Sequence, residues 1–241
     1  MTTAPDTATG NFDAEEIAKF DALAARWWDT EGDFRTLHDI NPVRLAYIQE
    51  RADITAAPVI DVGCGGGVLT EALARSGATV TGTDMAEKAL GVAKLHALEA
   101  ELNIDYQLTT AEALALERAG TYGTVTCLEM LEHVTSYADT VAACAALARP
   151  GANLFFSTIN RTPQAYALLI LGAEYIMQIL PRGTHEYAKF IRPSELAGAL
   201  RRAGLELVDI SGMSYNPFSR TTRIGRNVAA NYLVHARKPA A

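Results

Sequence analysis

The chain of 241 residues is long enough to bury one sizeable hydrophobic core, and 49% of its residues are hydrophobic. Its formal net charge of −7 argues against a nucleic-acid partner, which would require a basic face. The three cysteines, Cys64, Cys127 and Cys144, show no C-x-x-C pair and no metal spacing, so we expect reduced thiols in a cytoplasmic protein.

The N-terminal part of the chain predicts a short tail followed by a helical cap. Residues 1–10 lack the basic and apolar regions of a signal peptide, and we expect a disordered tail before a single domain over 11–241. Apolar residues at helical spacing over 13–28 indicate an amphipathic helix. A second helix should start at Asn41-Pro42, an N-cap followed by proline at the first helical position.

From residue 58 onward, the pattern alternates between strands and helices. Helices are expected near 67–76, 86–102 and 137–148, and two later strands, 205–210 and 228–235, follow one another without an intervening helix. We therefore expect an α/β fold, a Rossmann-like, seven-stranded, mostly parallel sheet with a C-terminal antiparallel strand. The first five strands are predicted at 58–62, 79–84, 104–108, 122–128 and 152–158.

A glycine-rich turn between two predicted strands is the strongest functional signal in the chain. The run Val59 to Gly67 reads as a buried strand, a glycine turn and a helix start, and Asp84 ends the next strand. An acid about 20 residues past such a turn is placed to bind ribose hydroxyls, so we expect an adenosine ligand. A dinucleotide-binding oxidoreductase would need a further glycine at 68, where the chain has Val68. The loop instead resembles the S-adenosylmethionine loop of class I methyltransferases; the alternative is an ordinary tight turn.

Residues around this loop are candidates for binding S-adenosylmethionine. The planar guanidinium of Arg44 suits bidentate pairing with the carboxylate of the cofactor. The equal alternative is that Arg44 is a surface arginine without a role in binding. Asp61 and the backbone of Gly63 and Gly65 belong near its amino-acid end. Asp84 would take the ribose hydroxyls, and Met85, the next residue, would lie against the adenine.

The segment after the fourth predicted strand carries two acids and a histidine. If this segment is helical, Glu129, Glu132 and His133 share one face. Three interpretations stay open: a divalent-cation site, a general base at His133 oriented by Glu132, or a capped helix start.

An apolar helical insertion follows the fifth strand, at about 161–192. Its core, residues 165–180, is too short to span a membrane and contains Glu174. Because basic residues lie near both ends, it could contact an anionic membrane surface; the alternative is a buried helix or a lid over the pocket.

Several motifs together closely resemble one family, the ubiquinone-biosynthesis O-methyltransferases, from about Asn11 to Arg237. The glycine loop alone is common to many methyltransferases, whereas its combination with the segments over 27–44 and 183–186 is specific. The motifs are Trp27-Trp28-Asp29, the segment from Leu37 to Arg44, the run from Asp61 to Gly67, the segment from Ala93 to Ala97, Glu129-Met130-Leu131-Glu132-His133 and Gly183-Thr184-His185-Glu186.

This resemblance implies O-methylation of 3-demethylubiquinol and of a 2-polyprenyl-6-hydroxyphenol. It implies cofactor contacts at Arg44, Gly63, Asp84 and Leu128, and a divalent cation such as Mg²⁺ at Glu129, Glu132 and His133. Other enzymes of the pathway are candidate partners, and the inner face of the membrane is a candidate contact through residues 165–180. The alternatives are methylation of a small soluble catechol and a non-catalytic scaffold that binds S-adenosylmethionine.

Overall fold

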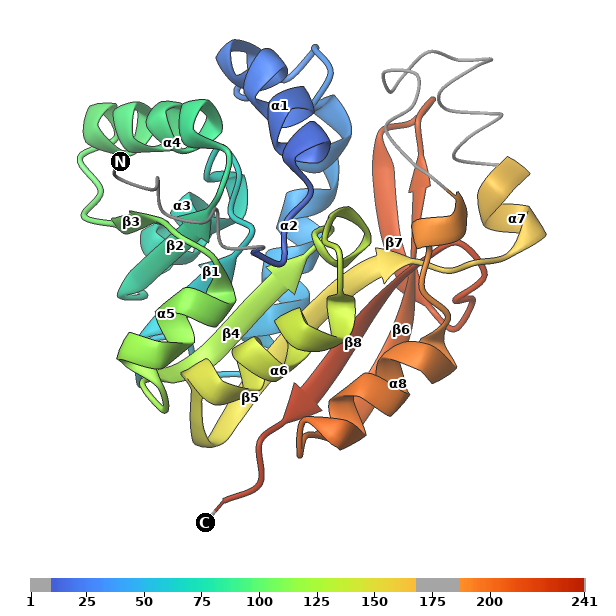
Figure 1. Cartoon of the computed structure of the whole chain (residues 1–241). Helices are drawn as coiled ribbons and strands as arrows, with labels where there is room; N and C mark the ends of the chain where they lie inside the picture. The colour runs from blue at the N-terminus through green and yellow to red at the C-terminus, as the bar shows by residue number, and fades with distance from the viewer. Residues whose placement is uncertain (1–9, 168–186, 241) are drawn as a thin grey trace, which may run out of the picture.

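The computed structural model describes residues 10–167 and 187–240, which build an eight-stranded sheet (Figure 1). The strand order is β3-β2-β1-β4-β5-β8-β6-β7, with β1 to β5 parallel and β8 antiparallel to both of its neighbours. The strands are β1 Val59–Val62, β2 Val80–Asp84, β3 Asp105–Leu108, β4 Tyr122–Leu128, β5 Ala148–Ile159, β6 Glu206–Asn216, β7 Thr221–Gly225 and β8 Asn231–Arg237.

Helices cover both faces of the sheet because the central strands are apolar on both sides. Ile60 and Val62 of β1 pack in one core cluster with side chains of α6 and α8, whereas Val59 packs in another with side chains of α2 and α3. The α-helices are α1 Ala14–Leu23, α2 Arg35–Gln49, α3 Val68–Arg75, α4 Glu87–Glu99, α5 Ala111–Arg118, α6 Tyr137–Leu147, α7 Pro163–Ala165 and α8 Pro193–Arg202. Short 3₁₀ helices are η1 Ala24–Arg26, η2 Leu131–His133 and η4 Tyr187–Lys189.

The sheet confirms the five predicted parallel strands and the antiparallel C-terminal pair, and it adds one strand. β7 was not predicted, so the sheet has eight strands rather than seven. Only Thr222 and Ile224 of β7 are partly covered, and the rest of this edge strand is exposed. An edge strand with so little apolar side chain gives a weak sequence signal.

The start of the second helix was predicted wrongly. α2 begins at Arg35, and Pro42 lies inside it, where one backbone hydrogen bond is lost. Asn41 does not cap this helix; its side-chain amide donates to the carbonyl of Val68, at the start of α3. Asn41 thus ties α2 to the helix after the glycine loop. Helices α5 and α8 were also not predicted.

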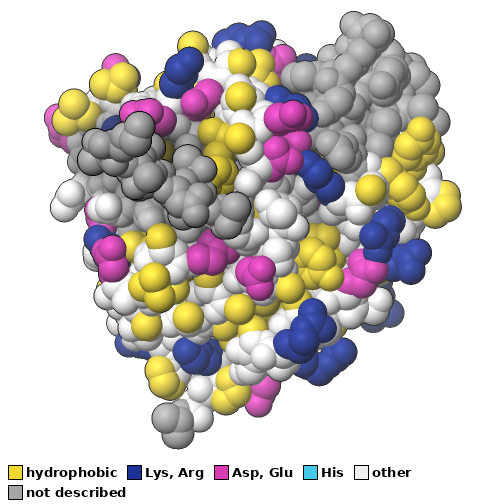
Figure 2. Space-filling view, in the orientation of Figure 1, with side chains coloured by type: hydrophobic (Ala, Val, Ile, Leu, Met, Phe, Trp, Pro, Cys, Tyr) yellow, Lys and Arg dark blue, Asp and Glu magenta, His cyan; other side chains and the backbone are white. Residues whose placement is uncertain are grey.

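Some predicted features fall where nothing can be described. Residues 1–9, most of the segment 165–180 and the motif at 183–186 lie outside the described residues. Within 10–167 and 187–240, no helix has the length and apolar character needed to cross a membrane. On the face shown in Figure 2, basic side chains are spread among acidic and hydrophobic ones, with several over α8.

Candidate active site

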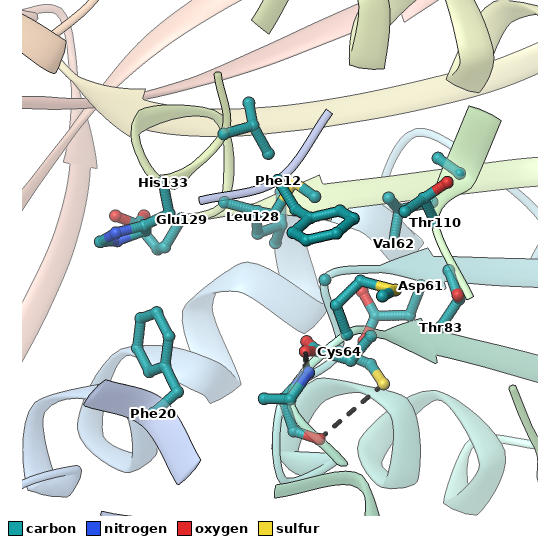
Figure 3. Close-up of a pocket in the computed structure, with 18 of the residues that line it drawn as sticks. Phe12, Phe20, Asp61, Val62, Cys64, Thr83, Thr110, Leu128, Glu129 and His133 are labelled. Atoms are coloured by element: carbon teal, nitrogen blue, oxygen red, sulfur yellow. Dashed lines mark hydrogen bonds between the residues drawn. The ribbon is translucent and has the colours of Figure 1, made fainter. Parts of the chain in front are cut away.

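A pocket lies at the carboxyl ends of β1, β2 and β4, where the strand order reverses between β1 and β4. Ligands of open α/β sheets bind at this reversal. The cap, which we define as residues 11–34, covers the pocket from the side of α1 (Figure 1). In Figure 3, His133, Glu129 and Phe20 lie at one end, Thr83 and Thr110 lie at the other, and Phe12 lies between.

The glycine loop is covered by the two tryptophans of the chain. A Cβ added to Gly65 or Gly66 would lie 2.2 Å from the indole of Trp27, so only glycine lets the ring pack here. Gly65 also has a φ of +52°, which favours glycine. The indole of Trp28 donates to the Gly66 carbonyl at 2.9 Å. These glycines therefore make room for the cap.

The cap is also fastened to the far side of the pocket through Asn11. Its side-chain amide donates to Glu112, to the Ser136 carbonyl and to Thr140, at 2.7 to 2.8 Å. Its carbonyl oxygen accepts from the Ser136 backbone amide at 2.6 Å. These bonds join the start of the cap to α5 and α6.

Asp61 is a buried residue that lines the pocket. Its two oxygens accept hydrogen bonds of 2.7 Å from Thr70 and Thr126. Burial raises the pKa of Asp61 to about 6, against the opposing effect of these hydroxyls and of Arg44. A buried carboxylate of this kind attracts a cationic group on a bound ligand.

Asp84 sits at the end of β2, as predicted. Its oxygens accept from the backbone amides of Gly65, at 2.7 Å, and Ala86, at 2.8 Å. Burial raises the pKa of Asp84, while these backbone donors oppose the shift. Each oxygen keeps a second lone pair for a hydroxyl donor.

Arg44 is buried rather than a surface arginine, and its guanidinium lines the pocket. Nη2 lies 3.0 Å from Oε1 of Glu129, close enough for an ion pair but not aligned as a hydrogen bond. Nε has no hydrogen-bond partner, and Nη2 has only this contact with Glu129. A buried guanidinium with an unpartnered Nε suits a carboxylate ligand.

Glu129 is held as the partner of Arg44. Ser157 donates to Oε1 at 2.7 Å, and Asn231 donates to both carboxylate oxygens at 3.0 to 3.1 Å. Burial would raise the pKa of Glu129, but the charge of Arg44 and these donors hold it below its usual value. Glu129 therefore fixes the guanidinium in place as a carboxylate.

The two acids and the histidine do not share one face, which was expected only if their segment were helical. Glu129 has a left-handed backbone with φ of 53°, so the segment is not a continuous helix. Glu132 turns to β5, where Thr158 donates to Oε2 at 2.7 Å, and its Oε1 has no partner. Burial and the charge of Glu129 raise the pKa of Glu132.

This arrangement does not fit the expected divalent-cation site. Glu129 is committed to Arg44, Ser157 and Asn231, and Glu132 is turned toward Thr158. In the part of the chain that the structure describes, no three His, Cys, Asp or Glu side chains are grouped to hold a metal ion.

His133 is paired with Glu16 of the cap, a residue that the sequence interpretation missed. The imidazole Nδ1 lies 2.9 Å from Glu16 Oε2, so the acid hydrogen-bonded to this nitrogen is Glu16 and not Glu132, which was expected there. The hydrogen bond with His133 lowers the pKa of Glu16 to about 2, with burial opposing. Burial would lower the pKa of His133, but Glu16 and the nearby acids raise it.

Most of the predicted site residues meet in this one pocket. Glu132 is the exception, because it does not line the pocket. Residues of the cap that were not predicted, including Asn11, Ile17 and Phe20, line it as well. The predicted residues that line it are Arg44, Asp61, Gly63, Gly65, Asp84, Met85, Leu128, Glu129 and His133.

Comparisons with known proteins identify the family of this chain. The sequence model of the methyltransferase domain family matches residues 37–210. The ubiquinone biosynthesis O-methyltransferase of Saccharophagus degradans is 56% identical over 229 residues, 95% of this chain and 97% of that protein. The protein of the same name from Pseudomonas aeruginosa is 53% identical over 230 residues, 95% of this chain and 99% of that protein.

Solved structures support the fold. Magnesium protoporphyrin IX methyltransferase from Synechocystis PCC 6803, solved with bound SAH, superposes with a TM-score of 0.68 at 20% identity. The match covers 92% of this chain and 99% of that chain. Taken with the sequence identities above, these findings show that the chain belongs to the ubiquinone biosynthesis O-methyltransferase family.

Proposed function

We propose that this chain transfers a methyl group from S-adenosylmethionine to a ring hydroxyl of a prenylated phenol or quinol in ubiquinone biosynthesis. The two acceptors are 3-demethylubiquinol and 2-polyprenyl-6-hydroxyphenol. The observation that carries the proposal is the buried guanidinium of Arg44, whose Nε has no hydrogen-bond partner, in one pocket with the glycine loop and Asp84.

The pocket offers a partner for each part of the cofactor. Arg44 binds the carboxylate in bidentate fashion, and Asp61 attracts the ammonium group. Asp84 accepts from the ribose hydroxyls. Met85 and Leu128 supply apolar contacts, and Thr110 lines the adenine end.

The cofactor supplies a methyl group carried on a sulfonium sulfur. A phenol with a pKa near 10 is mostly neutral at pH 7, so the site must take its proton. His133 accepts that proton, the phenol oxygen bonds to the methyl carbon, and the carbon–sulfur bond breaks with its electrons left on sulfur. Because Glu129, Glu132 and His133 do not form a metal-ligand set, we route no step through a metal ion.

The proposed acceptors carry an apolar prenyl tail, which favours a location at a membrane. The segment 165–180 is apolar and flanked by basic residues, so we propose that it meets the inner face of the cytoplasmic membrane. Flotation with anionic liposomes tests this, comparing the wild type with a Leu169→Glu, Ile176→Glu variant. We expect only the wild type to float; equal flotation would contradict the proposal.

The function is tested by mass spectrometry of quinone intermediates in cells that lack this chain. We expect both hydroxylated intermediates to accumulate, and wild-type chain to restore ubiquinone. A His133→Ala variant should fail to restore it while binding the cofactor normally in vitro. An unchanged ubiquinone pool without the chain would contradict the proposed function.

A further inference from the structure

Glu16 lies at the centre of a small network between the cap, the acidic-histidine segment and the end of the insertion. Oε2 is 2.9 Å from Nδ1 of His133, and Oε1 accepts from Lys19 at 2.9 Å and from Lys189 at 3.4 Å. Lys189 also lies 3.1 Å from Asp13. Glu16 is only 5% exposed. Its carboxylate is held by neighbours on three segments, α1, η2 and η4.

A carboxylate at Nδ1 decides which imidazole nitrogen carries the proton. With a neutral ring, Glu16 can only accept, so the hydrogen lies on Nδ1 and the lone pair lies on Nε2. A base removes the phenol proton with that lone pair. The same hydrogen bond fixes the orientation of the ring in the pocket.

Phe20, one turn further along α1, holds the same ring from a second side. Its ring meets the His133 imidazole edge to face, with centroids 5.1 Å apart. Phe20 and Ile17 line the pocket beside His133, and Figure 3 shows the Phe20 ring pointing toward the imidazole. Helix α1 therefore supplies His133 with a hydrogen-bond acceptor, Glu16, and an apolar contact, Phe20.

We propose that Glu16 is the positioning residue for His133, and that docking of the cap over the pocket completes the active site. This inference rests on the proposed function, because it assigns a partner to the proposed base. Glu16 acts through His133 and touches neither the cofactor nor the acceptor in this role.

The central experiment is a double-mutant cycle with Glu16→Ala, Glu16→Gln and His133→Ala, measured as kcat, KM and cofactor Kd. Glu16→Ala should lower kcat on the order of 100-fold, with KM and Kd within about twofold. Glu16→Gln should recover part of that loss, because its amide oxygen can still accept from Nδ1. In the His133→Ala background, Glu16→Ala should have no further effect.

The matched control is Glu15→Gln, an equal charge change on the exposed side of the same helix. It should leave kcat unchanged. Additive losses for Glu16 and His133, an unchanged kcat in Glu16→Ala, or a loss explained by weaker cofactor binding would each overturn the proposal.

Nitrogen-15 NMR of the histidines separates this inference from the proposed function. The wild type should show His133 with its proton on Nδ1, and Glu16→Ala should shift this tautomer while Glu15→Gln should not. A wild type without methyl transfer but with this tautomer change would refute the proposed function and leave the pairing intact. A tautomer insensitive to Glu16 would refute the pairing itself.

Discussion

The carboxylate of Glu16 and the imidazole of His133 are 117 residues apart in the sequence and 2.9 Å apart in the structure. This pair joins the cap to the segment after β4, at the end of the pocket where Arg44 and Glu129 also lie. The same cap therefore lines the pocket and contacts His133, the proposed base, and several consequences can be measured.

Replacing Arg44 by lysine should weaken cofactor binding while leaving the fold intact. Lysine keeps the charge but loses the planar fork that pairs with a carboxylate. Since a hydrogen bond to a charged group contributes about 1.5–3 kcal/mol, we expect affinity to fall about 10- to 100-fold. Calorimetry with S-adenosylhomocysteine measures this, and wild-type affinity in Arg44→Lys would contradict the assignment.

Glu129→Gln should also weaken cofactor binding, and it should do so in the presence of a chelator. The amide loses the charge that holds the Arg44 guanidinium at 3.0 Å, so the guanidinium is less well placed. We expect about a tenfold rise in Kd in EDTA. If affinity were unchanged and only metal-dependent turnover were lost, Glu129 would instead be a metal ligand.

Cofactor affinity should fall as the pH drops below about 6. Burial raises the pKa of Asp61 to about 6, so its carboxyl is ionised above that pH and protonated below it. Protonation removes the attraction for the ammonium group of the cofactor. Titration calorimetry from pH 5 to 8 should show a fall of cofactor affinity at low pH in the wild type and a much smaller fall in Asp61→Asn. An equally steep fall in that variant would count against Asp61.

Gly66→Ala and Gly91→Ala form a matched pair of substitutions. The new methyl at 66 would lie 2.2 Å from Trp27, which should destabilise the protein by about 1–3 kcal/mol. At 91, inside α4, nothing lies within 4 Å, and alanine should stabilise by about 1 kcal/mol. Thermal unfolding with tryptophan fluorescence measures both, and equal shifts would show that Trp27 does not pack on the loop.

The sequence predicted the parallel sheet and the cofactor end of the pocket because those signals are local. The glycine run, the carboxylate of Asp84 and the apolar strands each lie within one short window. Arg44 was recognised as a candidate, but its burial depends on packing of α2 that no window contains.

The cap contacts of Asn11 and Glu16 could not be predicted, because they join residues more than 100 positions apart. One signal was present at Glu16, which lies four residues before Phe20 on the apolar side of the predicted helix. An acid among apolar positions on a helix face suggests a buried partner. Whether the acidic-histidine segment is helical was left open, because the left-handed backbone of Glu129 has no glycine to mark it.

The most direct test of the account is transfer of an isotope-labelled methyl group by the purified, folded chain. S-adenosylmethionine labelled in its methyl group is supplied with a prenylated demethylquinol, and the products are separated and weighed by mass spectrometry. The account predicts one labelled methyl ether on the ring for each S-adenosylhomocysteine formed. Cofactor binding without any label on the acceptor would contradict it.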